Sequence, residues 1–146
     1  MIEGVLLTKE KVIRHELGDI YHAMKSGSPG FSGFGEAYFS TVHSGVTKGW
    51  NRHERMVLNL LVPLGKIRFV LYDDRENSAT THQFMDVTLS TLNYLRLTIP
   101  PGIWIAFKGM DDGTSLLLNV ASIGHDPAEM KKVPLDKISY SDWNKA

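Results

Sequence analysis

The sequence has 146 residues, 42% of them hydrophobic and 22% charged, which is typical of a globular chain long enough to bury a core. Sixteen lysine and arginine residues balance sixteen aspartate and glutamate residues, so neither a nucleic-acid partner nor a polybasic membrane anchor is expected. The absence of cysteine excludes disulfides, thiolate metal ligands and a cysteine nucleophile.

No apolar run approaches the roughly 20 residues of a membrane span, and the first residues lack a signal-peptide pattern. We therefore expect one cytoplasmic domain over residues 1–146. Short runs of alternating or β-branched residues predict strands, first within residues 1–18 and then beyond a glycine- and serine-rich loop at residues 25–35. The later strands are expected at 36–42, 84–89, 95–99, 103–107 and 115–123, with a strand pair between residues 45 and 74.

Asp126 followed by Pro127 has the pattern of a capped helix start near the end of the chain. Many short strands with one short helical segment predict an all-β sandwich or barrel.

The stretch from Gly45 to Asp74 places a polar cluster directly before an apolar run. We predict two strands here, joined by the Pro-Leu-Gly-Lys turn at residues 63–66, with the cluster opening the first strand. Polar groups crowded at the mouth of a hydrophobic strand pair predict a pocket inside a β-barrel. Asn51 and His53 share a strand face, so both are expected to point into the barrel. The alternative is a solvated end of a hairpin. The cluster consists of Lys48, Asn51, Arg52, His53, Glu54 and Arg55.

The same stretch resembles the first motif of the cupin superfamily, Gly-x5-His-x-His-x(3,4)-Glu-x6-Gly. Gly45 and Gly65 keep its spacing, and residues 100–105 match the spacing of the second motif, Pro-x-Gly-x-x-His. The resemblance implies a jelly-roll cupin barrel with a short C-terminal helical segment.

Of the four cupin positions that ligate a metal, only His53 keeps a ligating side chain. The other three are Asn51, Leu58 and Ile105. One imidazole without partner ligands cannot hold a divalent ion against water, so we expect no metal and no other cofactor.

Within the cupins, the chain from about residue 34 to residue 143 resembles the dTDP-4-dehydrorhamnose 3,5-epimerase family and related sugar-nucleotide ketoisomerases. GVTKGWN at residues 45–51 parallels Gly-Val-Leu-Arg-Gly-Leu-His of that family, and IPPGIWIAF at residues 99–107 parallels its Ile-Pro-x-Gly-Phe-Ala-His-Gly-Phe. VPLDKISYSDW at residues 133–143 matches its carboxy-terminal segment. The resemblance implies an isomerase that acts on a nucleoside-diphosphate 4-keto-sugar in polysaccharide biosynthesis.

In that family a histidine, oriented by an aspartate, removes the proton beside the 4-keto group, and a tyrosine returns one on the other face. Here the histidine position is Asn51 and the tyrosine position is Asn119, so the usual pair is replaced. Ile105 stands where the family has a second histidine. His53 matches the second histidine of the related ketoisomerases, and Asp136 matches the orienting aspartate.

The resemblance therefore implies His53 and Asp136 as catalytic residues. Lys48 replaces an arginine of the family and keeps a positive charge for the diphosphate. The expected partners are a nucleoside-diphosphate sugar and a second copy of the chain in a homodimer. The residues expected to bind substrate are Lys48, Asn51, Arg55, Phe107, Asn119 and His125.

A second hypothesis is a non-catalytic cupin that binds a sugar nucleotide and has lost the base–acid pair. The replacements at Asn51 and Asn119 favour it, whereas Lys48, His53 and Asp136 favour the enzyme. Structural roles also stay open, with His53 as a hydrogen-bonded histidine at the barrel rim and Asn119 bonded to a neighbouring strand.

Overall fold

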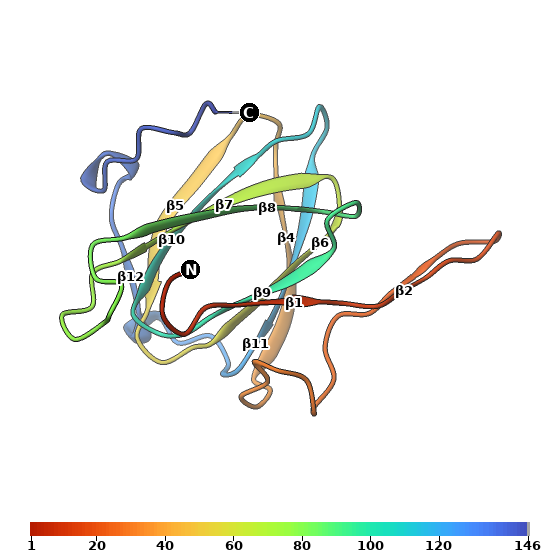
Figure 1. Ribbon diagram of the computed structural model, residues 1–146, viewed down its shortest axis with the longest axis horizontal. Coiled ribbons are helices and arrows are strands. Elements are labelled where there is room, and N and C mark those ends of the chain that lie inside the picture. Colours follow the sequence, from red (N-terminus) through yellow and green to blue (C-terminus); the bar gives the residue numbers. More distant parts are fainter. Residues whose placement is uncertain (146) are drawn as a thin grey trace.

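The computed structural model describes residues 1–145, so Ala146, the last residue of the expected domain, lies outside the described residues. The chain forms two five-stranded antiparallel sheets that face each other, and a small two-stranded sheet (Figure 1). The first sheet has the order β1 (Leu6–Lys9), β9 (Leu95–Ile99), β6 (Leu58–Leu64), β11 (Ser115–Ala121) and β4 (Glu36–Val42). The second has the order β12 (Met130–Lys132), β5 (Thr47–His53), β10 (Ile103–Gly109), β7 (Lys66–Asp73) and β8 (Phe84–Ser90).

The small sheet pairs β2 (Val12–Ile13) with β3 (Ile20–Tyr21) in a hairpin that projects from the body of the molecule (Figure 1). Two single turns of 3-10 helix, η1 (Pro127–Glu129) and η2 (Leu135–Lys137), lie near the carboxy terminus. None of the helices within residues 1–145 is long and apolar enough to cross a membrane.

The strand pairing is nested: β4 pairs with β11, β5 with β10, β6 with β9 and β7 with β8. Consecutive strands from β4 to β7 alternate between the two sheets, and the partners return in reverse order. This is the pairing of a jelly roll, so the predicted all-β jelly-roll fold is confirmed.

The main core lies between the two sheets and contains side chains from both. β7 and β10 are buried on both faces, because a second cluster covers the outside of their sheet. On β10, Ile103 and Ile105 point into the barrel, whereas Trp104 and Ala106 join the outer cluster. The carboxy-terminal segment, including Trp143, covers that cluster and so supports the strands that line the site from behind.

The prediction of one strand pair for residues 45–74 is wrong, because three strands occupy this stretch. The polar cluster begins on β5 in the second sheet and continues past its end to Arg55. β6 belongs to the first sheet, and β7 returns to the second. Strand β5 ends at His53 because the next three backbone N–H groups donate to the Glu129 carboxylate rather than to a neighbouring strand. These are the N–H groups of Glu54, Arg55 and Met56. The turn at Gly65, whose φ is +83°, therefore joins two sheets and not the strands of a hairpin.

The strands predicted at residues 36–42, 84–89, 95–99, 103–107 and 115–123 are confirmed, with ends shifted by at most two residues. The predicted helix start is also confirmed, since the Asp126 side chain accepts a hydrogen bond from the Ala128 amide. The helix stops after one 3-10 turn because β12 begins at Met130 and pairs with β5.

Candidate active site

Strand β5 brings Lys48 to the same side as Asn51 and His53 because it contains a bulge. Gly49 and Asn51 pair with consecutive residues of β10, so Trp50 is an extra residue on β5. The extra residue resets the alternation of side chains. Lys48 therefore faces the same cavity as Asn51 and His53, although a regular strand would point it to the opposite side.

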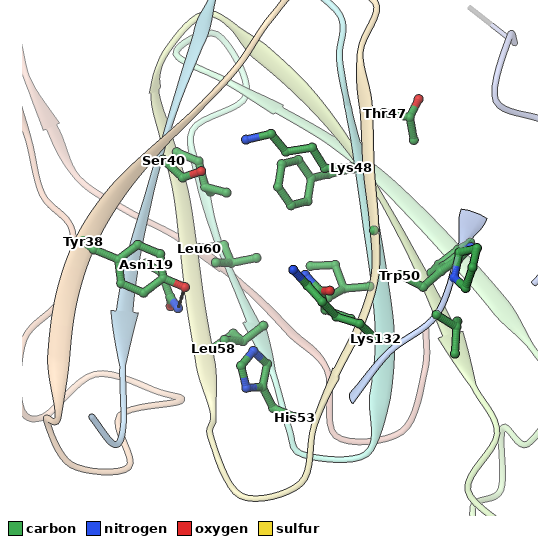
Figure 2. A pocket seen from close by; sticks show the side chains of 17 residues that line it. Tyr38, Ser40, Thr47, Lys48, Trp50, His53, Leu58, Leu60, Asn119 and Lys132 are labelled. Carbon is green, nitrogen blue, oxygen red and sulfur yellow. Dashed lines mark hydrogen bonds between the residues drawn. The ribbon is translucent and has the colours of Figure 1, made fainter. Parts of the chain in front are cut away.

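The cavity between the two sheets has a volume of about 730 Å³, which is within the usual range for small-molecule sites. Apolar side chains from both sheets, among them Leu60, Ile105 and Leu117, form its walls. Figure 2 shows His53 and Lys48 toward opposite ends of this cavity, with Tyr38 and Asn119 along one side. The cavity thus combines an apolar lining with a few polar groups that converge on it.

His53 is held by a buried carboxylate. Its Nδ1 hydrogen-bonds Oε1 of Glu129, which η1 and the start of β12 place beside β5. The other oxygen of Glu129 accepts from the backbone N–H groups of Glu54, Arg55 and Met56 at 3.1, 3.1 and 3.2 Å. Both side chains are shielded, with exposed fractions of 13% for His53 and 3% for Glu129.

The surroundings of Glu129 keep its carboxylate charged. Burial opposes ionisation, but hydrogen bonds from His53 and from the backbone N–H groups of Arg55 and Met56 outweigh it, so the pKa of Glu129 is lowered. An ionised carboxylate can only accept, so the hydrogen on the shared bond belongs to Nδ1 of His53. Nε2 of a neutral His53 then carries a lone pair at the cavity, as a general base requires.

On the facing sheet, Asn119 lies within the cavity wall at 1% exposure. Its Oδ1 accepts from the backbone N–H of Asn59 at 3.1 Å, and its Nδ2 donates to the hydroxyl of Tyr38 at 3.1 Å. The bond to a neighbouring strand, which was one reading of Asn119, is therefore present together with its place in the cavity.

Two lysines supply positive charge to the cavity lining, and Trp50 anchors the strand that carries one of them. Lys48 donates to the backbone carbonyl of Thr41 at 2.6 Å, and Lys132 on β12 lines the same cavity. Trp50 is fully buried and donates to the Leu135 carbonyl at 3.2 Å, which ties β5 to the carboxy-terminal segment. The two lysines that line the cavity make it suited to an anionic group.

The structure brings together five of the eight residues selected from the sequence: Lys48, Asn51, His53, Phe107 and Asn119 all line the cavity. The other three lie outside its lining. Arg55 is exposed and forms an ion pair with Asp126 at 2.8 Å, and His125 is exposed in the same region. Asp136, which was matched to the family's orienting aspartate, is exposed on η2, and the carboxylate that hydrogen-bonds His53 is that of Glu129.

Sequence reasoning missed Glu129, Tyr38 and Lys132. Glu129 was visible only as an acidic residue in a capped turn, and Lys132 follows it in a short charged strand. Tyr38 alternates with Ser40 on β4, so the strand pattern alone places both on one face. Within residues 1–145 no three histidine or acidic side chains gather where they could hold a metal ion. The absence of a metal stays a prediction.

Comparison with known proteins identifies the family, although no protein-family model matches the sequence. The chain is 32% identical over 112 residues to the probable low-salt glycan biosynthesis epimerase Agl13 of Haloferax volcanii, covering 74% of this chain and 72% of that protein. The dTDP sugar isomerase from Desulfovibrio desulfuricans G20 superposes with a TM-score of 0.93 at 38% identity, covering 99% of this chain and 94% of that one. The chain belongs to the dTDP-sugar epimerase and isomerase family. The spore coat polysaccharide biosynthesis protein SpsL of Bacillus subtilis is 24% identical over 147 residues, which cover 99% of this chain and 97% of that protein.

Membership of the dTDP-sugar epimerase and isomerase family confirms the resemblance drawn from the motifs. Asn51, Ile105 and Asn119, which the motif comparison predicts to differ from the family pattern, all line the cavity. His53 and Glu129 stand beside them as a histidine–carboxylate pair.

Proposed function

We propose that this protein is a sugar-nucleotide epimerase or isomerase that acts on a nucleoside-diphosphate 4-keto-sugar during the synthesis of a polysaccharide or glycan. Its relatives support the reaction class, since they are named as a glycan biosynthesis epimerase and a dTDP sugar isomerase. The observation that carries the proposal is the hydrogen bond from His53 to the buried Glu129 at the cavity wall.

The first step is proton removal by His53. Nε2 takes the proton from a carbon next to the 4-keto group, and the electron pair of that C–H bond forms an enolate with its charge on the keto oxygen. The imidazolium that results is stabilised by the Glu129 carboxylate on Nδ1. Glu129 thus orients the ring, fixes its tautomer and balances the charge that the ring acquires.

The enolate oxygen needs a polar partner, and the nucleotide needs a cationic one. Asn51 lies two residues before His53 on the same face of β5, where its amide is positioned to donate to an oxygen on the sugar. Lys48 and Lys132 face the same cavity and supply positive charge for the diphosphate. Neither role involves removal of a proton.

The protein is further proposed to act as a homodimer. Two features support this assembly: β4 is an edge strand of its sheet with Phe39 exposed, and the β2–β3 hairpin projects with Leu17 and Ile20 exposed (Figure 1). Light scattering of the parent protein and of a Leu17→Asp, Ile20→Asp variant tests this, with a dimer expected to give way to a monomer. The cytoplasmic location expected from the sequence also stays a prediction.

Proton exchange tests the proposed function directly. A thymidine-diphosphate 4-keto-6-deoxyhexose is followed by NMR in deuterated buffer with and without the protein. Deuterium entering a carbon next to the keto group, faster than in buffer alone, is the expected result. Binding without such exchange would instead make the protein a non-catalytic sugar-nucleotide cupin, and neither binding nor exchange would reject both functions for this ligand.

A further inference from the structure

The wall opposite His53 contains the phenol of Tyr38. The motif resemblance matches Asn119 on β11 to the family's tyrosine, and Tyr38 on β4 is the direct partner of Asn119 in the antiparallel register. Both side chains line the cavity, on the sheet that faces the one carrying His53. A hydroxyl is thus supplied next to this position from the neighbouring strand, as Figure 2 shows for the two labelled side chains.

The orientation of the Asn119 amide is fixed by its two hydrogen bonds. Because Oδ1 faces a donor, the backbone N–H of Asn59, the Nδ2 group must point toward Tyr38. The phenol oxygen of Tyr38 is therefore an acceptor in this contact. Its own hydrogen stays available for another group, and Tyr38, an exposed residue, lines the cavity.

Asn59, whose backbone N–H orients Asn119, has a side chain that is itself held by hydrogen bonds. Its Oδ1 accepts from Nη1 of Arg96 at 2.7 Å and from the Thr98 hydroxyl at 2.6 Å. Arg96 is fully buried and also donates to Glu10 at 2.8 Å. A buried polar network in which each member is bonded holds its geometry, so the Asn119 amide that contacts the Tyr38 hydroxyl is anchored to the core of the barrel.

We propose that Tyr38 is the second proton-transfer residue of the site, and that Asn119 is its positioning residue. This role rests on the proposed function. A sugar ring held between the two sheets presents one face to His53 on β5 and the other to Tyr38 on β4. His53 removes the proton from one face, and Tyr38 returns a proton to the other, which inverts the carbon.

The transfer balances without a co-reactant. As the new C–H bond forms, the Tyr38 O–H bond breaks and the enolate electron pair becomes the C–H bond, which restores the ketone. The phenolate that remains accepts the hydrogen bond from Nδ2 of Asn119, and this bond strengthens as the charge develops. Solvent reprotonates Tyr38 and takes the proton from His53, so both residues return to their starting states.

The test separates exchange from inversion. The same keto-sugar nucleotide is incubated in deuterated buffer, and NMR measures both deuterium entry and the configuration of the carbon. For Tyr38→Phe we expect exchange within about threefold of the parent protein but inversion reduced on the order of 10²-fold, with deuterium entering on the original face. Tyr72→Phe is the matched control, since the Tyr72 hydroxyl contacts His82 outside the cavity lining, and both rates should remain at the parent level.

A second variant tests the positioning role. Asn119→Leu should lower inversion roughly 10-fold with KM unchanged, and should have no further effect in a Tyr38→Phe background, because residues that act as one unit are not additive. Equal inversion by Tyr38→Phe and the parent protein would overturn the role of Tyr38. Exchange by the parent without any inversion would also overturn it, whereas absence of exchange by the parent would reject the proposed function itself.

Discussion

The carboxylate of Glu129 and the imidazole of His53 lie 76 residues apart in the sequence and form a hydrogen bond at the cavity wall. The bond joins η1 to β5. The second carboxylate oxygen accepts hydrogen bonds from the three backbone N–H groups that follow the end of β5. The same carboxylate therefore shapes the end of β5 and fixes the tautomer of the histidine on it. Three predictions and a final measurement test this arrangement and its surroundings.

Replacing Glu129 with glutamine should inactivate His53 while keeping the shape of the site. The three backbone N–H groups require an oxygen, so the glutamine amide nitrogen is left facing Nδ1 of His53 and donates to it. Nε2 must then carry the hydrogen, and the lone pair that takes the substrate proton is lost. We expect the exchange rate of Glu129→Gln to fall by about 10²- to 10⁴-fold, measured by NMR in deuterated buffer.

Asp136→Asn is the matched control for that experiment. Asp136 is exposed on η2, and the contact with His53 is made by Glu129. The exchange rate of Asp136→Asn should stay within about twofold of the parent, in line with other exposed substitutions. A loss in this variant as large as that in Glu129→Gln would assign the orienting role to Asp136, as the family resemblance implies.

Lys132 and Lys131 are neighbours on β12 with different surroundings. Lys132 lines the cavity, whereas the Lys131 ammonium lies 3.8 Å from Glu54. Lys132→Ala should raise KM about tenfold, equivalent to about 1.4 kcal/mol, with the effect shrinking as salt screens the charge. Lys131→Ala should leave KM unchanged, and steady-state kinetics at low and high ionic strength measure both. Equal KM effects of the two variants would contradict a diphosphate contact for Lys132.

Protonation of Asp73 should lower the stability of the protein in acid. Burial opposes its ionisation, but hydrogen bonds from Arg75, Ser78 and Thr80 outweigh it, so the pKa of Asp73 is lowered in the folded state. A lowered pKa stabilises the fold above the unfolded value of 3.8, and this contribution is lost as pH falls below about 4 toward the folded pKa.

Urea unfolding at pH 7 and pH 3 measures this contribution. We expect Asp73→Asn to cost about 2 kcal/mol in the free energy of unfolding at pH 7, since hydrogen bonds to a charged group are lost. The same variant should lose less stability than the parent protein between pH 7 and pH 3. If the free energy of unfolding depended on pH identically in both proteins, the stabilising role of the ionised Asp73 carboxylate would be contradicted.

Much of the fold could be predicted because its signals are local. The alternating strands β8 to β11 are bounded by proline, glycine and aspartate turns that can be read in the sequence. The division of residues 45–74 into three strands was missed because its cause is distant. The N–H groups after His53 have their acceptor on Glu129, and the sequence around His53 does not show this partner.

The candidate site follows the same rule. Asn51 and His53 were predicted to share a face because strand alternation is a local property. Lys48 reaches that face only through the bulge at Trp50, which depends on pairing with β10. Tyr38 and Glu129 could not be recognised, since their roles come from partners 81 and 76 residues away in the sequence.

The most direct test of the central claim is the exchange rate of a His53→Asn variant. Deuterium entry into the 4-keto-sugar is compared with that of the parent protein, and calorimetry measures the affinity of each for thymidine diphosphate. Exchange should fall by about 10²- to 10⁴-fold while affinity stays within about threefold, because asparagine keeps a polar side chain but cannot take the proton. Exchange at the parent rate with asparagine at position 53 would contradict the assignment of His53 as the base.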